Sequence, residues 1–191
     1  MLPPAPRQYY RLVSALGALA FARRALPECE LWIAGVDRIG SSWSEFSRVL
    51  LDTAQRFGVP QDAVQLLPRY ERQQAPDIFR QGDVFLHPVC NDACPNVVVE
   101  ALASGLPVVF SQTGGVPELV TSAEGVGVKS LCSWEQFTPP PPEDLGAGIV
   151  KIFSDYEQYS QRARLRAETH FGVESYLAKH AEIFSAKARG S

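Results

Sequence analysis

The sequence predicts an α/β protein, a doubly wound parallel sheet that leads into a helical C-terminal tail over about 143–187. Short apolar runs alternate along the chain with segments of helical character, the order expected of parallel strands joined by crossover helices. The runs are apolar throughout, as in strands that are covered on both faces. The 191 residues are enough for one domain with a hydrophobic core, so we expect 1–191 to form a single domain.

The first part of the chain predicts a helix, a strand and a second helix. The Ala- and Leu-rich stretch 7–26 favours a helix that a proline turn ends. ELWIAG at 30–35 is apolar without alternation, which is typical of a buried strand. Ser42 or Ser44 can then cap a helix over roughly 44–57.

The middle of the chain continues the alternation. VQLL at 64–67 predicts the second strand, and a short helix follows at 74–81. DVFLHP at 83–88 predicts the third strand. The next helix opens at Pro95, which suits the first turn of a helix, and it ends at Gly105.

The last part of the chain closes the sheet and then becomes helical. LPVVFS at 106–111 predicts the fourth strand and GVGVK at 125–129 a fifth. Only helices are predicted beyond these strands, at 143–154, 156–169 and 173–187.

Charge and hydropathy exclude two classes of partner. The net charge is -3, and no basic stripe with interleaved aromatic residues is present, so we expect no nucleic-acid partner. No apolar run approaches the roughly 18 residues of a membrane-spanning helix. Arg7, Arg11, Arg23 and Arg24 could give peripheral contact with an anionic membrane surface, although a solvated helix face is the favoured interpretation.

The four cysteines show no disulfide-scaffold density and no CxxC pair. Cys29, Cys90, Cys94 and Cys132 are therefore interpreted as reduced thiols, which favours a cytoplasmic location. The CxxxC spacing of Cys90 and Cys94 lacks a second ligand pair. We therefore predict no metal site.

Two unusual loops follow neighbouring predicted strands. VCNDACPN follows the strand at 83–88, and QTGGVPE follows the strand at 106–111. Open parallel sheets bind their ligands at the carboxyl ends of the strands. The helix that opens at Pro95 leaves the amides of Asn96, Val97 and Val98 free at the positive end of its dipole. These amides predict an anion site that suits a phosphate or diphosphate.

Two carboxylates and two glycines complete the predicted site. Glu100 can accept two hydroxyl hydrogen bonds, as from a ribose diol, and Asp92 can accept another or support a developing positive charge. Gly114 and Gly115 allow a ligand to approach the backbone closely. Simpler interpretations stay open at this stage: Asp92 as a helix cap, Glu100 as a buried, paired acid, and the two glycines as an ordinary turn.

The stretch GDVFLHPVCNDACPNVVVEALASGLPVVFSQTGGVPELV resembles the nucleotide-sugar-binding half of family 4 retaining glycosyltransferases, which have the GT-B fold. The family pattern is a DVFVxPS-type strand, an acid, seven residues, a glutamate followed by Ala, then G-x-PVV and GG-x-x-E. Asp92 and Glu100 occupy the two acidic positions, with Asp where Glu is commoner. LPECELWIAG, FGVPQDAVQLLPRY and THFGVESYLAKHAEIF extend the resemblance over nearly the whole chain.

The resemblance implies a Rossmann-like domain that binds a nucleoside-diphosphate sugar without a cofactor or required metal. The helix-start amides would hold the diphosphate, Glu100 the ribose and Asp92 the transferred sugar as the catalytic-site acid. Arg69 and Tyr70 would lie against the base. Amide and cation donors would neutralise the leaving diphosphate.

The sequence departs from the family in what precedes its first helix. The family's C-terminal domain opens with a strand ending in Gly-Arg, followed shortly by a Lys, and these two cations clamp the diphosphate. Nothing before Arg7 has this pattern, and the N-terminal acceptor-binding domain is not found in the sequence. Two hypotheses follow: a donor-binding half that a separate domain or chain completes, or an inactive remnant that binds a nucleotide or protein. An unrelated dinucleotide-binding protein is disfavoured, since no G-x-G-x-x-G follows a strand.

Overall fold

The computed structural model describes residues 7–35, 42–132 and 137–188, and its strands form three separate sheets. In the first sheet β1 (Leu31–Ala34) pairs in parallel with β2 (Val64–Leu67). The second is parallel in the order β3 (Phe85–His87), β4 (Val108–Ser111), β5 (Gly125–Val128). The third is a small antiparallel pair. Its strands are β6 (Leu131–Cys132) and β7 (Phe137–Thr138).

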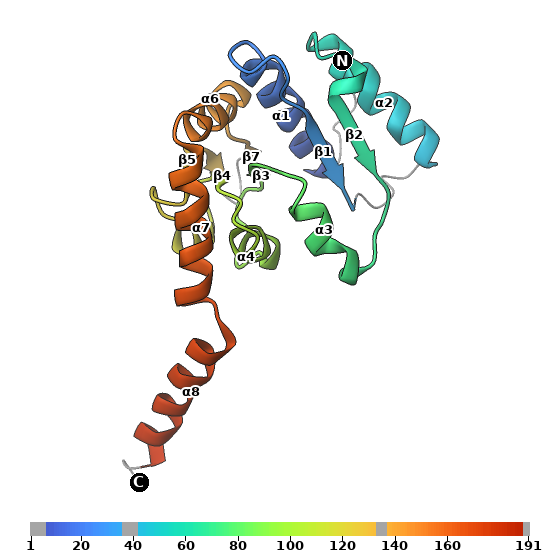
Figure 1. The fold of residues 1–191 in the computed structure, drawn as a ribbon. Helices are drawn as coiled ribbons and strands as arrows, with labels where there is room; N and C mark the ends of the chain where they lie inside the picture. The colour runs from blue at the N-terminus through green and yellow to red at the C-terminus, as the bar shows by residue number, and fades with distance from the viewer. Residues whose placement is uncertain (1–6, 36–41, 133–136, 189–191) are drawn as a thin grey trace.

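Helices connect and cover these strands (Figure 1). In the N-terminal half they are α1 (Arg7–Ala22), α2 (Trp43–Arg56), the 3₁₀ turns η1 (Gln61–Ala63) and η2 (Arg72–Gln74), and α3 (Ala75–Phe79). In the C-terminal half they are α4 (Asn96–Ala103), α5 (Val116–Leu119), α6 (Pro142–Phe153), α7 (Tyr156–His170) and α8 (Val173–Ala188).

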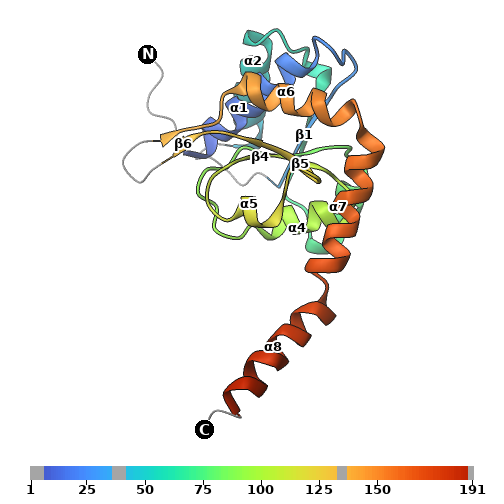
Figure 2. The same cartoon turned by 90° about the vertical axis from the view of Figure 1, so that its left-hand side faces the viewer.

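The three-stranded sheet is covered on both faces, as its apolar strands predict. Val108 and Phe110 of β4 pack with α4, α5 and α7, whereas Val109 between them packs with α1 and α6. Figure 2 shows α1 and α6 on one side of the sheet and α4 and α5 on the other. Because successive side chains of a strand point to opposite faces, a fully apolar strand needs such a two-sided cover.

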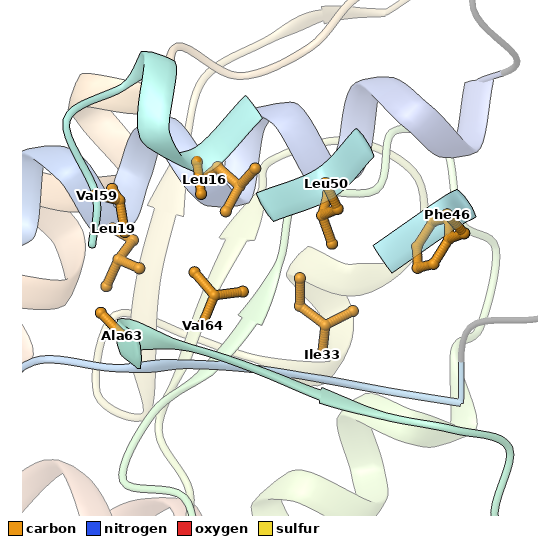
Figure 3. Close-up of a cluster of buried hydrophobic side chains, with 9 residues drawn as sticks. Leu16, Leu19, Ile33, Phe46, Leu50, Val59, Ala63 and Val64 are labelled. Atoms are coloured by element: carbon orange, nitrogen blue, oxygen red, sulfur yellow. The ribbon is translucent and has the colours of Figure 1, made fainter. Parts of the chain in front are cut away.

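The two-stranded sheet has a core of its own (Figure 3). Leu16 and Leu19 of α1 meet Leu50 of α2 above Ile33 of β1 and Val64 of β2. Ser42 begins α2 as its N-cap, accepting a hydrogen bond from the Glu45 amide. One of the two predicted caps is therefore confirmed, and this cap fixes where the amphipathic face of α2 starts.

The predicted α/β architecture is confirmed, and the structure corrects several details. The parallel strands form two sheets instead of one. The first helix ends at Ala22 rather than at residue 26, and the helix predicted from Pro95 begins at Asn96. Short elements at α5, β6 and β7 were not predicted, because runs of two to four residues are too short for a periodic pattern.

The last helix, α8, leads away from the body of the molecule (Figures 1 and 2). Its apolar side chains stay in contact with solvent: Val173 is 72% exposed and Phe184 is 70% exposed. The predicted C-terminal helices are thus present, but only α6 and α7 contribute to the core. An isolated helix of this length is only marginally stable in water, and most helical stability in proteins comes from packing an apolar face against another surface.

Candidate donor site

The loop after β3 and the loop after β4 are joined backbone to backbone. The Gly115 amide donates to the Asp92 carbonyl oxygen at 2.9 Å, and the Asn91 amide donates to Thr113 Oγ1 at 3.0 Å. Asn91 adopts a left-handed conformation with φ 55°, which turns the chain into this contact. The sequence prediction that these two loops meet at one edge of the sheet is therefore confirmed.

The two glycines make this contact sterically possible. Gly114 has φ +68°, and a Cβ atom there would collide with the Asp92 backbone. A Cβ atom at Gly115 would collide with the Ala93 carbonyl oxygen. The bare backbone of these residues therefore faces the neighbouring loop. The Gly115 amide is already hydrogen-bonded to the Asp92 carbonyl oxygen. The two glycines would therefore contribute to a ligand site by fixing the position of Asp92.

Asp92 is half-buried and faces a buried histidine. Its Oδ2 atom lies 3.4 Å from Nε2 of His87, the last residue of β3. His87 is only 5% exposed, and its Nε2 atom has no hydrogen-bond partner among the described residues. The 3.4 Å separation exceeds the length of an ordinary hydrogen bond, about 2.9 Å. The pair is therefore a polar contact that a small movement would shorten into a hydrogen bond.

The surroundings of His87 keep its ring neutral. Burial is the largest influence and lowers the pKa of His87; Asp92 opposes this effect and the Arg11 guanidinium adds to it. A neutral imidazole can carry its proton on Nε2 and donate it toward Asp92. The sequence analysis missed His87, because a histidine at the end of an apolar strand has no distinguishing spacing.

The start of α4 differs from the prediction, and the difference changes which backbone amides are available to an anion. Pro95 is the N-cap residue with φ -74° and ψ 110°, and its carbonyl accepts the Val98 amide at 3.0 Å. Val98 is fully buried, so its amide is not available to an anion. Within the described backbone hydrogen bonds, none uses the amides of Asn96 and Val97. These two amides remain as donors at the positive end of the helix.

Glu100 is exposed and lines a hollow of about 1060 Å³ together with Arg69 and Tyr70. The ring of Tyr70 lies over Gly35, the residue after β1, so the hollow joins the ends of the first sheet to the outer side of α4. The sequence resemblance placed these three side chains around one ligand, and the structure brings them together. Asp92 and Asn96 are not among the residues that line this hollow.

Three further arginines in this hollow were not anticipated from the sequence. Besides Arg69, the lining includes Arg72, Arg80 and Arg164. Arg164 comes from α7, where it bonds Glu168 and the Ala103 carbonyl oxygen at the end of α4. Its separation from Glu100 in the sequence leaves no local signal that could have revealed this neighbourhood.

The structure removes two of the simpler interpretations. Asp92 makes no capping hydrogen bond to α4, whose N-cap is Pro95, so the helix-cap interpretation is wrong. Glu100 is exposed, so it is not a buried, paired acid. The turn interpretation of the glycines is consistent with the positive φ of Gly114, but the contact with Asp92 and Ala93 adds a specific packing role.

The cysteine prediction needs one correction. Cys29 and Cys94 are free thiols, but Cys90 is disulfide-bonded, so the expectation of four reduced thiols is wrong. No cluster of His, Cys, Asp and Glu able to hold a metal ion occurs in the described part of the chain. Across those same residues, no helix is both long and apolar enough to cross a membrane.

Comparison with known proteins identifies the family. Residues 7–155 match the sequence model of the glycosyl transferases group 1. The chain belongs to this family. Among curated relatives, the D-inositol 3-phosphate glycosyltransferase of Segniliparus rotundus is 32% identical over 173 residues, which are 91% of this chain and 33% of that protein. The gpi3 subunit of phosphatidylinositol N-acetylglucosaminyltransferase from Schizosaccharomyces pombe is 31% identical over 96 residues, 50% of this chain and 19% of that protein.

Solved glycosyltransferase structures share the fold. HepE of Anabaena in complex with UDP superposes with a TM-score of 0.70 at 23% identity, covering 97% of this chain and 46% of that one. Sucrose-phosphate synthase of Thermosynechococcus elongatus gives 0.68 at 19% identity, covering 93% and 43%. This group 1 glycosyltransferase chain thus spans a third or less of the curated relatives described and under half of the solved chains.

Proposed function

We propose that this chain is the donor-binding part of a retaining glycosyltransferase, which transfers a sugar from a nucleoside-diphosphate sugar to an acceptor. The observation that carries the proposal is the hollow in which exposed Glu100 faces Arg69 and Tyr70. Family membership supports sugar transfer, and HepE, whose structures contain UDP and UDP-glucose, has the same fold. The acceptor-binding part is supplied by a further domain or chain.

In this proposal each part of the donor meets a particular group of the chain. The Tyr70 ring stacks on the base, Arg69 lies beside it, and the Glu100 carboxylate accepts from the ribose hydroxyls. The Asn96 and Val97 amides hold the diphosphate, where the helix dipole favours negative charge. Asp92, fixed by Gly114 and Gly115 and facing His87, contacts the transferred sugar.

The Glu100 and Asp92 roles are separable by calorimetry with UDP, GDP and ADP and with their glucose derivatives. Glu100→Gln removes a charged hydrogen-bond acceptor. It should weaken the binding of the preferred nucleotide, and of the corresponding nucleotide sugar, by about 1–3 kcal/mol. Asp92→Asn should weaken the binding of the nucleotide sugar and leave the binding of the plain nucleotide unchanged. Glu143→Gln, an exposed glutamate at the start of α6, is the matched control and should change neither.

The melting temperature distinguishes this scheme from a purely structural one. Glu100 is exposed and Asp92 is half-buried, so both variants should melt close to the wild-type chain. Normal nucleotide binding by Glu100→Gln, combined with early melting, would contradict the donor-site assignment.

The proposed site uses no metal ion, because amides and arginines neutralise the diphosphate. We therefore expect EDTA to leave the affinity for the nucleotide sugar unchanged in the same calorimetric titration. A loss of binding on chelation that added Mg²⁺ restores would rule out the assignment of the diphosphate to the start of α4. The cytoplasmic location stays a prediction.

A further inference from the structure

A chain of three hydroxyl side chains leads to the loop that carries Asp92. Ser111 is the last residue of β4 and is fully buried. Its Oγ atom lies 2.8 Å from Ser130 Oγ and 2.9 Å from Thr113 Oγ1. Thr113 Oγ1 in turn accepts a hydrogen bond from the Asn91 amide at 3.0 Å. The hydroxyl chain therefore ends at the residue immediately before Asp92.

The hydroxyl chain crosses the edge of the three-stranded sheet at which parallel sheets bind their ligands. The strands β3, β4 and β5 lie side by side in that order (Figure 1). Ser130 follows β5, Ser111 ends β4, and Asn91 lies in the loop after β3. Because the backbone ladder of β3 ends before this loop, side-chain hydroxyls supply part of the contact between the strand ends. The hydroxyl chain thus ties together the carboxyl ends of three neighbouring strands.

Two hydrogen bonds restrain the backbone around Asp92, and one of them comes from this hydroxyl chain. Thr113 accepts from the amide before Asp92, and the Gly115 amide donates to the Asp92 carbonyl oxygen at 2.9 Å. Asn91 has a left-handed φ of 55°, a conformation that a residue other than glycine keeps only when its surroundings hold it. The direction in which the Asp92 carboxylate leaves the chain therefore depends on Thr113.

Ser111 acts on the loop through Thr113. The strand β4 has the sequence VVFS, and all four of its residues are buried, so Ser111 is the polar exception in an apolar strand. A serine hydroxyl can donate one hydrogen bond and accept two, which lets Ser111 pair with both of its hydroxyl neighbours. By pairing with Thr113 Oγ1, Ser111 fixes the rotamer in which Thr113 accepts the Asn91 amide.

We propose that Thr113 and Ser111 are positioning residues of the donor site, which orient Asp92 toward the transferred sugar through the Asn91 amide. This inference rests on the proposed function, in which Asp92 contacts that sugar. Neither hydroxyl residue belongs to the described residues that line the hollow of Glu100. Their effect is therefore on the sugar part of the donor, and the nucleotide part binds without them.

Amide hydrogen exchange, followed by NMR on the ligand-free 191-residue chain, tests the contact itself. Thr113→Val keeps the shape of the side chain and removes the acceptor, so the Asn91 amide should exchange at least tenfold faster. Thr113→Ser keeps the hydroxyl and should retain the wild-type rate. An unchanged Asn91 rate in Thr113→Val would overturn the proposal, whether or not the chain binds a nucleotide sugar.

Calorimetry tests the consequence for the donor, with UDP, GDP and ADP and their glucose derivatives as probes. Thr113→Val should weaken the binding of the nucleotide sugar at least fivefold and leave the binding of the plain nucleotide unchanged. Ser111→Ala should act in the same direction; if its melting temperature shows that it does not fold, the isosteric Thr113 variant decides. Thr53→Val, at a hydroxyl on α2 that donates to the Val49 carbonyl oxygen, is the control and should change neither affinity. Equal weakening of both ligands by Thr113→Val would indicate a general structural effect and overturn the proposal.

A double variant shows whether Thr113 acts through Asp92. In the Asp92→Asn background, Thr113→Val should weaken the binding of the nucleotide sugar no further, since its effect passes through the same carboxylate. Additive losses would refute the proposal. If Asp92→Asn weakens the binding of the nucleotide sugar and Thr113→Val does not, only this inference fails. If Asp92→Asn has no effect, the proposed role of Asp92 in the donor site fails, and this inference fails with it.

Discussion

At the scale of single residues, the contact between His87 and Asp92 links the donor loop to the core. His87 ends a buried strand, stacks near Phe85 with ring centroids 6.0 Å apart, and presents Nε2 to the Asp92 carboxylate. A buried nitrogen without a full hydrogen bond is unfavourable by about 1–3 kcal/mol. A tightened bond in the presence of donor would hold Asp92 in one orientation.

The lowered pKa of His87 makes stability depend on pH. The unfolded chain takes up a proton near the ordinary histidine pKa of about 6.5, whereas the folded chain resists protonation until a lower pH. The unfolded state therefore binds more protons in this window. Stability should fall as the pH drops below about 6.5 toward the folded-state pKa, and stay level above that window.

Urea unfolding at pH 7.5 and pH 5.5 measures this effect. His87→Phe removes the titrating ring and keeps a flat side chain, so we expect a smaller loss of stability on acidification than in the wild-type chain. His170→Phe changes an exposed ring on α7 and serves as the control. An equal loss in the wild type and the His87 variant would mean that other groups cause the dependence.

At the scale of elements, the loops after β3 and β4 act as one unit because glycine allows their backbones to touch. Gly114 and Gly58 both have positive φ, so alanine at either position is strained by about 1–2 kcal/mol. Only at Gly114 does the new Cβ atom meet another backbone; at Gly58 nothing lies within 4 Å. The two positions therefore separate conformational strain from loop packing.

We expect Gly114→Ala to destabilise the chain by about 2 kcal/mol more than Gly58→Ala, since a backbone clash adds to the strain. Chemical denaturation of the two variants gives the difference directly. The Gly114 variant should also bind the nucleotide sugar more weakly, because Asp92 moves with its loop. Equal destabilisation in both variants would show that the loop contact contributes nothing.

At the scale of the whole molecule, the proposed donor site belongs to a chain that covers only part of its relatives' length. This chain covers 33% of the Segniliparus relative and 46% of the HepE chain, whose fold it shares. Transfer requires an acceptor to be held against the donor sugar, and each group that stabilises the leaving diphosphate is worth about 10²–10³ in rate.

We therefore expect the purified 191-residue chain to transfer no sugar by itself. Incubation with radiolabelled nucleotide sugars and lipid, glycan and inositol phosphate acceptors measures this, with Glu100→Gln as the control for contaminating enzymes. Turnover by the wild-type chain that the Glu100 variant loses would show that these residues are a complete enzyme.

The sequence alone determined the local features of this protein. The apolar strands and the Ser42 cap depend on features within a few residues, which the residue types reveal. The glycine pair at 114–115 is conspicuous in the sequence, but its contact with Asp92 and Ala93 is visible only in the structure. The acids at Asp92 and Glu100 were found in the same way, because a carboxylate in an apolar context is conspicuous.

Only the tertiary structure decided which groups share a site. It placed His87 against Asp92, brought Arg164 from α7 to the hollow of Glu100, and opened a cavity between two sheets that the strand pattern predicts as one. These facts depend on the packing of segments distant in the chain, and local spacing carries no information about such contacts.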